Sequence, residues 1–226
     1  MGKKYVIAID GPAASGKSTT ARQLAKLLHY VYIDSGAMYR ASGLQTLLKG
    51  IKLTELDSLK DMLQEIEIRI EYAAEGNSIY LDDQDVSARI READITRLAS
   101  EIAVIGIVRG KMVELQRKMG EDGGVIMDGR DIGTVVFPDA DYKFFMDANV
   151  KTRALRRWQE AKEKGEELIL EEVEQELQWR DQNDSTRSHS PLRQAEDAIL
   201  IDTSSMNIEQ QVEYIYKIVR EGKCMK

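Results

Sequence analysis

A glycine-rich motif near the start of the chain constrains its fold more than any other feature. Gly11-Pro-Ala-Ala-Ser-Gly16-Lys17-Ser18 matches the pattern G-x-x-x-x-G-K-[ST]. A β-rich apolar run over 5–10 precedes it, and apolar residues at helical spacing follow it over 21–28. In this strand–loop–helix context, backbone N–H groups and the positive end of the helix can surround an anion. The motif therefore predicts a phosphate-binding loop (P-loop) at the end of a buried strand.

The same motif predicts a nucleoside triphosphate with Mg²⁺ as the ligand. Lys17 can reach the β- and γ-phosphates, and the Ser18 hydroxyl can ligate the metal, whose other ligands are mostly water and phosphate. Asp34 and Asp128 both end apolar runs, at the sheet edge where the loop is expected. Either can hold the magnesium through water or serve as a turn or capping carboxylate. The predicted triphosphate-binding residues are Gly11, Pro12, Ala13, Ala14, Ser15, Gly16, Lys17, Ser18 and Thr19.

The rest of the chain repeats the strand-then-helix pattern. Short apolar runs ending in Asp recur at 5–10, 31–34, 125–128, 142–147 and 198–202, with helical patterns between them. This alternation indicates an α/β fold, a P-loop core with a parallel sheet flanked by helices.

One stretch, residues 63–96, departs from the strand-then-helix pattern. Apolar and polar residues alternate over 66–72, which predicts a half-buried strand. A turn is predicted at Gly76-Asn77, a second strand over 78–82 and a second turn over 83–85. We expect a small antiparallel β insert here, within a single domain over 1–226.

The composition of the chain limits the kinds of partner that it can bind. The net charge of −7 argues against nucleic acid, which is held by surplus Lys and Arg. The lone Cys224 is typical of a reducing compartment. The apolar run before Asp10 is too short for a signal peptide or a membrane span. We expect a cytoplasmic monomer with no membrane partner.

The motifs also favour one class of P-loop chemistry. No asparagine begins a guanine-reading N-K-x-D segment, which argues against a GTPase. A small P-loop domain with an insert suits phosphoryl transfer to a second small molecule. The stretch 151–187 is polar, charged and helical in propensity, with a break at Gly165, and predicts an exposed arm or helical lid. Its Arg153, Arg156 and Arg157 either cover the phosphoryl group or form surface ion pairs on a solvated helix.

Arg109 is a second candidate by position. On a helix predicted over 97–119, it falls at the margin of the apolar stripe. It either meets an anionic or polar partner there or extends to solvent along the rim.

Three further motifs closely resemble the bacterial cytidylate kinases. They are Asp34-Ser-Gly-Ala-Met-Tyr-Arg40, Asp128-Gly-Arg-Asp-Ile-Gly-Thr-Val-Val-Phe-Pro138 and Arg180-Asp-Gln-Asn-Asp184-Ser-Thr-Arg187. The resemblance runs essentially from end to end. It implies transfer of the γ-phosphate of ATP to CMP or dCMP, a three-stranded monophosphate-binding insert, and a lid that closes over ATP.

The resemblance also implies residue roles. Cytosine would be read by Ser35, Ser100, Arg109, Asp131 and Arg187. Asp184 would hold the sugar hydroxyl, and the acceptor phosphate would be held by Arg40, Arg130 and Arg180. The candidate catalytic residues are Lys17, Arg130, Arg153, Arg157 and Arg180. No general base is required, because the acceptor phosphate is already an anionic nucleophile.

Two rival interpretations remain at this point. Another small-molecule P-loop kinase would use UMP, AMP or a metabolite hydroxyl as acceptor. A non-catalytic nucleotide-binding module is disfavoured, because it has no chemical need for Lys17, Ser18 and a full set of acceptor arginines.

Overall fold

The computed structural model describes residues 3–73, 76–163 and 165–222, so Cys224 lies outside the described residues. The chain divides into two compact units. The first consists of Met1–Tyr32 and Asp122–Lys226, and the second of Ile33–Glu121. Each is described separately below.

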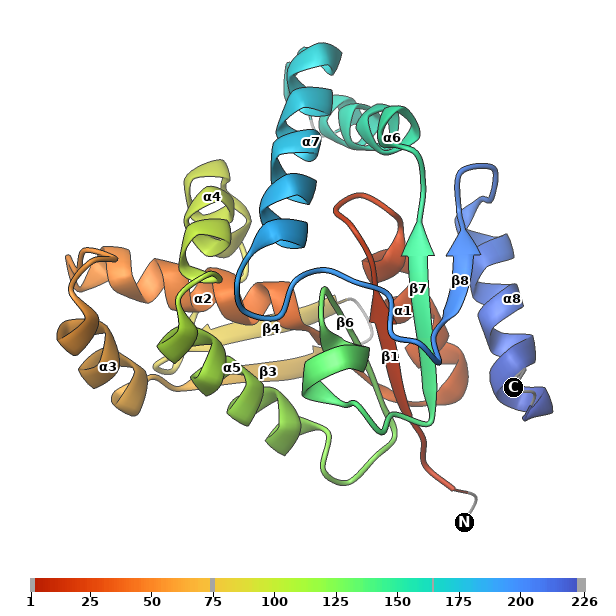
Figure 1. The fold of residues 1–226 in the computed structure, drawn as a ribbon, viewed down its shortest axis with the longest axis horizontal. Helices are drawn as coiled ribbons and strands as arrows, with labels where there is room; N and C mark the ends of the chain where they lie inside the picture. Colours follow the sequence, from red (N-terminus) through yellow and green to blue (C-terminus); the bar gives the residue numbers. More distant parts are fainter. Residues whose placement is uncertain (1–2, 74–75, 164, 223–226) are drawn as a thin grey trace. The chain divides into compact units, whose positions relative to one another are not determined.

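The first unit is built on a sheet with the strand order β2-β6-β1-β7-β8 (Figure 1). The pairs β1–β6, β1–β7 and β7–β8 are all parallel. The five predicted apolar runs all form strands, which confirms the predicted α/β class. The strands are β1 (Val6–Asp10), β2 (Val31–Asp34, which runs into the second unit), β6 (Val125–Gly129), β7 (Tyr142–Asp147) and β8 (Ile199–Asp202).

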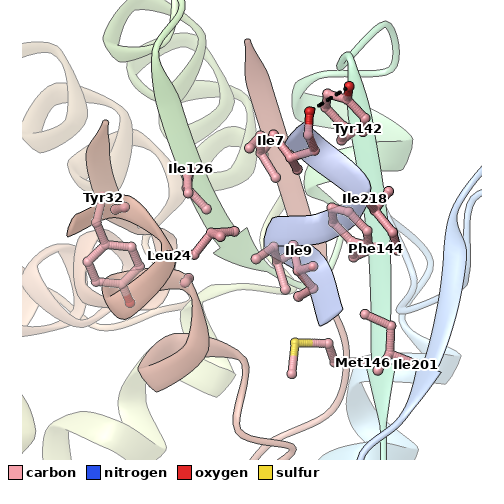
Figure 2. Close-up of a cluster of buried hydrophobic side chains, with 14 residues drawn as sticks. Ile7, Ile9, Leu24, Tyr32, Ile126, Tyr142, Phe144, Met146, Ile201 and Ile218 are labelled. Atoms are coloured by element: carbon pink, nitrogen blue, oxygen red, sulfur yellow. Dashed lines mark hydrogen bonds between the residues drawn. The ribbon is translucent and has the colours of Figure 1, made fainter. Parts of the chain in front are cut away.

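Helices accompany this sheet and close its core. Helix α1 packs against α8, and Leu24 of α1 and Ile218 of α8 lie among strand residues such as Ile9 and Phe144 (Figure 2). Each fully buried aliphatic side chain of this kind stabilises the fold by roughly 1.5–3 kcal/mol relative to exposure. The helices of the first unit are α1 (Lys17–Leu28), α6 (Val150–Glu163), α7 (Leu170–Thr186) and α8 (Ile208–Glu221), with a π-helical turn at Ile132–Val136.

The register of the sheet determines where loops leave it. Asp10, the last residue of β1, is paired with Gly129, the last residue of β6. The P-loop begins at Gly11, directly after β1, and Arg130 and Asp131 directly follow β6. Because the two strands are parallel and end level, the phosphate loop and the Arg130–Asp131 segment start side by side.

The stretch 151–187 forms helices α6 and α7, which pack against each other, and Gly165 between them has φ +77°. We expected an exposed arm or a lid rather than core, but part of this stretch is buried. Ala154, Val173 and Leu177 are buried in a small apolar cluster with Ala13 of the P-loop. The two helices are therefore packed on the phosphate loop in the first unit.

The second unit contains the insert. Strands β3 (Ile68–Ala73), β4 (Gly76–Leu81) and β5 (Gln84–Asp85) form an antiparallel sheet, as the fold prediction requires. Gly76 is a ladder residue of β4 paired with Ala73, not a turn residue, and 74–75 lie outside the described residues. The remaining elements are α2 (Ser35–Leu48), α3 (Leu56–Glu65), a 3₁₀ turn (Arg89–Arg91), α4 (Ala93–Ile102) and α5 (Gly106–Met119).

The prediction of one helix over 97–119 is wrong. Helix α4 ends at Ile102 and α5 begins at Gly106, with Ile105 in an extended conformation (φ −81°, ψ 117°) between them. The apolar stripe continues through this break, so side-chain spacing alone does not reveal it. Among the residues described, no helix is long and apolar enough to cross a membrane.

Candidate functional site

The phosphate loop has the backbone conformation that its glycines permit. Gly11 has φ +151°, and a Cβ there would lie 2.0 Å from the Met146 carbonyl oxygen. Gly16 has φ +92° at the N-cap of α1, where a Cβ would lie 2.7 Å from Gln211 Oε1. Side chains at these two positions are excluded by backbone conformation and by space. The loop thus curves tightly into the N-terminus of α1, the geometry that binds phosphate.

Two buried polar residues, which no sequence motif indicated, bind the phosphate loop and the start of α1 through hydrogen bonds. Thr203 and Gln211 are both fully buried. The Thr203 hydroxyl donates to the Ser15 carbonyl oxygen at 2.9 Å. Gln211 accepts from the Thr20 hydroxyl at 2.8 Å and donates to the Met206 carbonyl oxygen at 3.0 Å. Nothing local in the sequence marks these residues, because they lie 188 and 191 positions from their partners.

Lys17 and Ser18 have distinct surroundings. The buried Lys17 ammonium donates to the Pro12 carbonyl oxygen at 2.8 Å. Burial lowers the pKa of Lys17 to about 7, and the positive charges of Arg130 and Arg180 contribute, against the opposing carboxylates of Asp128 and Asp184. A lysine at such a pKa regains its charge when an anion binds beside it.

Ser18 contacts Asp128, one of the two aspartates that could serve the metal. Its hydroxyl donates to Asp128 Oδ2 at 2.7 Å, and the Tyr32 hydroxyl donates to Oδ1 at 2.7 Å. Asp128 is almost completely buried. Hydroxyl and carboxylate oxygens are suitable for direct or water-mediated Mg²⁺ binding. No group of three or more His, Cys, Asp or Glu side chains forms a metal cluster in the described part of the chain.

The predicted acceptor residues of the first unit form one ionic cluster. Arg130 Nε donates to Asp184 Oδ2 at 2.6 Å, and Arg187 Nη1 lies 3.7 Å from Asp184 Oδ1. Arg187 Nη2 lies 3.8 Å from Asp131 Oδ1. Burial raises the pKa of Asp184, but Arg130 and Arg180 outweigh it, and the net pKa is below the ordinary value. The four side chains are thus oriented by one another, although they come from segments about 50 residues apart.

The lid arginines differ from one another. Arg153 is buried and donates to the carbonyl oxygens of Ala148 (2.8 Å) and Ala13 (3.2 Å) and to Asp181 (2.5 Å). Arg156 donates to the carbonyl oxygens of Thr203 and Met206. Only Arg157 is exposed, 3.9 Å from Glu160. Of the three, Arg157 alone has the surface ion pair that the alternative interpretation expected.

The predicted residues of the second unit are organised around Asp34. This carboxylate caps α2 by accepting from the Ala37 amide at 2.9 Å, and it accepts from Arg40 Nη2 at 2.9 Å. Burial raises the pKa of Asp34, but Arg40 and the amide outweigh it, so the net pKa is lowered. The Nε of Arg40 is buried and has no hydrogen-bond partner within the described residues. Asp34 therefore fixes Arg40 and leaves one of its donors for a ligand.

The other predicted residues of the second unit lie on three helices. Arg109 on α5 is buried, donates to the Ala103 carbonyl oxygen at 3.1 Å and lies 5.5 Å from the Tyr39 ring centroid. The expectation of a polar partner is met, and the alternative of a solvent-exposed rim arginine is wrong. Ser35 is buried at the start of α2. Ser100 on α4 donates weakly to the Thr96 carbonyl oxygen at 3.4 Å.

Comparison with known proteins adds to this geometry. Residues 7–221 match the family model described as cytidylate kinase. A cytidylate kinase of Chloroherpeton thalassium is 48% identical over 227 residues, covering 97% of this chain and 94% of the relative. A cytidylate kinase of Pediococcus pentosaceus is 44% identical over 226 residues, covering 100% of both chains.

One solved structure is similar to this chain in fold. An uncharacterized protein of Eubacterium ventriosum aligns with a TM-score of 0.52 at 12% identity, covering 97% of this chain and 99% of that one.

Proposed function

The chain belongs to the cytidylate kinase family, and we propose that it transfers the γ-phosphate of ATP to CMP or dCMP, giving ADP and CDP or dCDP. Family membership makes it a phosphotransferase that phosphorylates a nucleoside monophosphate. UMP, AMP or a metabolite hydroxyl as the main acceptor is not favoured, because the relatives match over essentially the whole chain.

The P-loop is proposed to hold the phosphates of ATP. Its backbone N–H groups and the N-terminus of α1 surround the anion, while Lys17 moves from the Pro12 carbonyl oxygen to the phosphates. Binding restores the positive charge of Lys17, since a nearby anion raises the pKa of an ammonium group. The charge is thus supplied where phosphoryl transfer needs it.

Ser18 and Asp128 fit Mg²⁺. A hydroxyl already 2.7 Å from a buried carboxylate presents two oxygen ligands of the type that this ion prefers, and water and phosphate would complete the coordination. When bound, the ion neutralises negative charge on the phosphates. Of the two aspartates, Asp128 suits this role, because it contacts the Ser18 hydroxyl, whereas Asp34 contacts Arg40 and the Ala37 amide.

Each unit carries residues for which a role in acceptor binding is proposed. In the first unit, Asp131 would accept from the cytosine N4 amino group, and Arg187 would donate to an acceptor atom of the base. Asp184 would hold the sugar hydroxyl. Arg130 and Arg180 would bind the acceptor phosphate, for which guanidinium groups are well suited. Uracil has a carbonyl oxygen where cytosine has its amino group, so Asp131 would lose its partner there.

In the second unit, Arg40 would bind the acceptor phosphate, while Ser35, Ser100 and Arg109 would contact the base. The buried Nε of Arg40 supports this assignment, since a guanidinium donor without a partner is costly unless a ligand satisfies it.

Catalysis would then depend on positioning the two substrates and on placing positive charge beside the transferred phosphoryl group. The acceptor phosphate attacks as an anion, so the site needs no base and must instead bring two anions together. Lys17, Arg130 and Arg180 would supply positive charge, since both arginines lie near enough to Lys17 to lower its pKa. Arg157 is the lid arginine exposed enough to reach a bound nucleotide. We propose that α6 and α7 close on ATP and that Arg153 acts through the loop it holds.

The observation that carries the proposal is the cluster of Asp131, Arg187, Asp184 and Arg130 in the same unit as the P-loop. Asp131→Ala tests it, because this change removes the proposed N4 acceptor and leaves the phosphate loop intact. We expect kcat/KM for CMP to fall at least about tenfold, the loss of one buried hydrogen bond, with ATP affinity within about twofold. Equal damage to CMP use and ATP binding would contradict the assignment.

A further inference from the structure

Asp10 is a buried carboxylate that none of the roles above uses. It is the last residue of β1, directly before Gly11 of the P-loop, and it is 4% exposed. Its Oδ1 accepts from the Ile132 amide at 2.8 Å, and its Oδ2 accepts from the Gly133 amide at 2.7 Å. Both carboxylate oxygens of Asp10 therefore bind the backbone of a segment that begins 122 residues further along the chain.

The two amides belong to the π-helical turn that directly follows Asp131. Amides at the start of a helical turn have no partner within it, so a carboxylate that accepts from both acts as an N-terminal cap. Hydrogen bonds between residues five apart close the turn: the Phe137 amide donates to the Ile132 carbonyl oxygen at 2.7 Å, and the Val136 amide donates to the Asp131 carbonyl oxygen at 3.2 Å. The backbone of Asp131 is thus fixed from one side by the turn, and the turn is fixed by Asp10.

Packing leaves the turn little freedom to shift. A Cβ at Gly133 would lie 3.2 Å from Lys143 Cδ and 3.4 Å from Asp10 Oδ2. The Lys143 ammonium donates to both oxygens of Asp197, at 2.9 and 2.7 Å, and to the Pro138 carbonyl oxygen. Lys143 therefore packs against the turn through its alkyl chain and binds the backbone just after the turn, while Asp10 accepts hydrogen bonds at its start.

Burial of Asp10 has an energetic cost. Desolvation raises its pKa to about 7, although the two amides act in the opposite direction. Among the charged groups around it, Asp131 raises this pKa further and Lys17 lowers it. Costly buried charges of this kind concentrate at functional sites.

We propose that Asp10 is a positioning residue for acceptor recognition: by capping the Ile132–Val136 turn, it places Asp131 and Arg130 relative to the start of the P-loop. Because Asp10 also directly precedes that loop, one residue sets the geometry between the proposed donor-phosphate site and the segment proposed to read cytosine. This inference rests on the proposed function, in that Asp131 reads the base.

Asp10→Asn tests the inference with almost no change in size. The amide keeps one acceptor oxygen but turns an NH₂ group toward one of the two backbone amides, so one cap hydrogen bond is lost. We expect kcat/KM for CMP to fall about tenfold, the loss of one buried hydrogen bond, and the CMP-to-UMP preference to fall with it. The KM for ATP should stay within about twofold, because the glycine-defined loop backbone is unchanged.

Asp197→Asn is the matched control. It makes the same Asp-to-Asn change on the other side of the turn and removes the charge that pairs with Lys143, but it leaves both cap hydrogen bonds in place. We expect it to keep the wild-type preference for CMP over UMP.

Gly133→Ala provides a second route if Asp10→Asn fails to fold. The added methyl group would lie 3.2 Å from Lys143 Cδ, which is closer than an ordinary contact. By moving the turn a few tenths of an ångström while the Asp10 carboxylate remains, it should lower the CMP-to-UMP preference. The inference is overturned if folded Asp10→Asn, or Gly133→Ala in its place, keeps the wild-type preference, or if Asp10→Asn weakens ATP and CMP use equally. Failure of the wild-type protein to prefer CMP would instead contradict the proposed function.

Discussion

The Ser18 hydroxyl donates a 2.7 Å hydrogen bond to the carboxylate of Asp128, which joins the end of the P-loop motif to the end of β6. The Tyr32 hydroxyl holds the other oxygen of the same carboxylate. From sequence, Asp34 and Asp128 were equal candidates for orienting magnesium. Their contacts favour Asp128 for this proposed role, because it lies beside the Ser18 hydroxyl, whereas Asp34 accepts from the Ala37 amide and from Arg40.

Asp128→Asn should weaken the use of magnesium specifically. The amide removes the negative charge beside Ser18, so we expect the Mg²⁺ concentration for half-maximal rate to rise about tenfold or more, as for outer-shell partners of metal ligands. Initial rates against Mg²⁺ at saturating nucleotides measure this. Asp34→Asn is the matched variant, and it should raise the KM for CMP through Arg40 and leave the Mg²⁺ dependence unchanged. The same Mg²⁺ dependence in both variants would contradict the assignment.

Arg153→Lys should destabilise the protein even without nucleotides. Lysine cannot bridge the Ala13 and Ala148 carbonyl oxygens and Asp181 at once, so at least one buried partner is left unsatisfied, at about 1–3 kcal/mol. Thermal unfolding of the ligand-free variant measures the change. Arg157→Lys, at an exposed surface pair, should stay within about 0.5 kcal/mol of wild type. Equal unfolding temperatures for the two variants would refute the structural role of Arg153.

Lys17 should take up a proton when ATP binds at pH 8. Its free pKa is lowered to about 7, so the group is mostly neutral at that pH, and the triphosphate raises the pKa and returns the charge. ATP affinity should therefore fall as pH rises above 7. Calorimetry at pH 8 in buffers of different ionisation enthalpy should give an uptake approaching about one proton per ATP. The variant Lys17→Arg carries a guanidinium group that stays charged, so it should abolish the uptake. Buffer-independent heat in the wild type would argue against the lowered pKa.

Much of the fold could be predicted from the sequence because its signals are local. The P-loop motif, the apolar strands and the amphipathic helices each carry their own pattern. The break between α4 and α5 could not be predicted, since apolar spacing continues through Ala103, Val104 and Ile105. Strand β5 is only two residues long, and it follows a turn in which Asp82 and Asp83 both have positive φ. Two residues are too few for an alternation of apolar and polar side chains to indicate a strand.

The residues of the candidate site likewise include some that local sequence patterns predict and some that they do not. Its motif residues could be named in advance, but the supporting residues could not. Asp10, Thr203 and Gln211 are recognisable only from contacts with partners more than 120 positions away. Arg153 was expected either to cover the phosphoryl group or to form a surface ion pair. Its burial against the P-loop backbone depends on how α6 packs, which charge patterning does not encode.

The most direct test of the account is a coupled ADP-release assay with ATP, magnesium and each of CMP, dCMP, UMP and AMP. We predict turnover dominated by CMP and dCMP, because the amino group of cytosine supplies the donor that Asp131 accepts. Comparable or greater turnover with UMP or AMP would contradict the proposed reading of cytosine by Asp131 and Arg187.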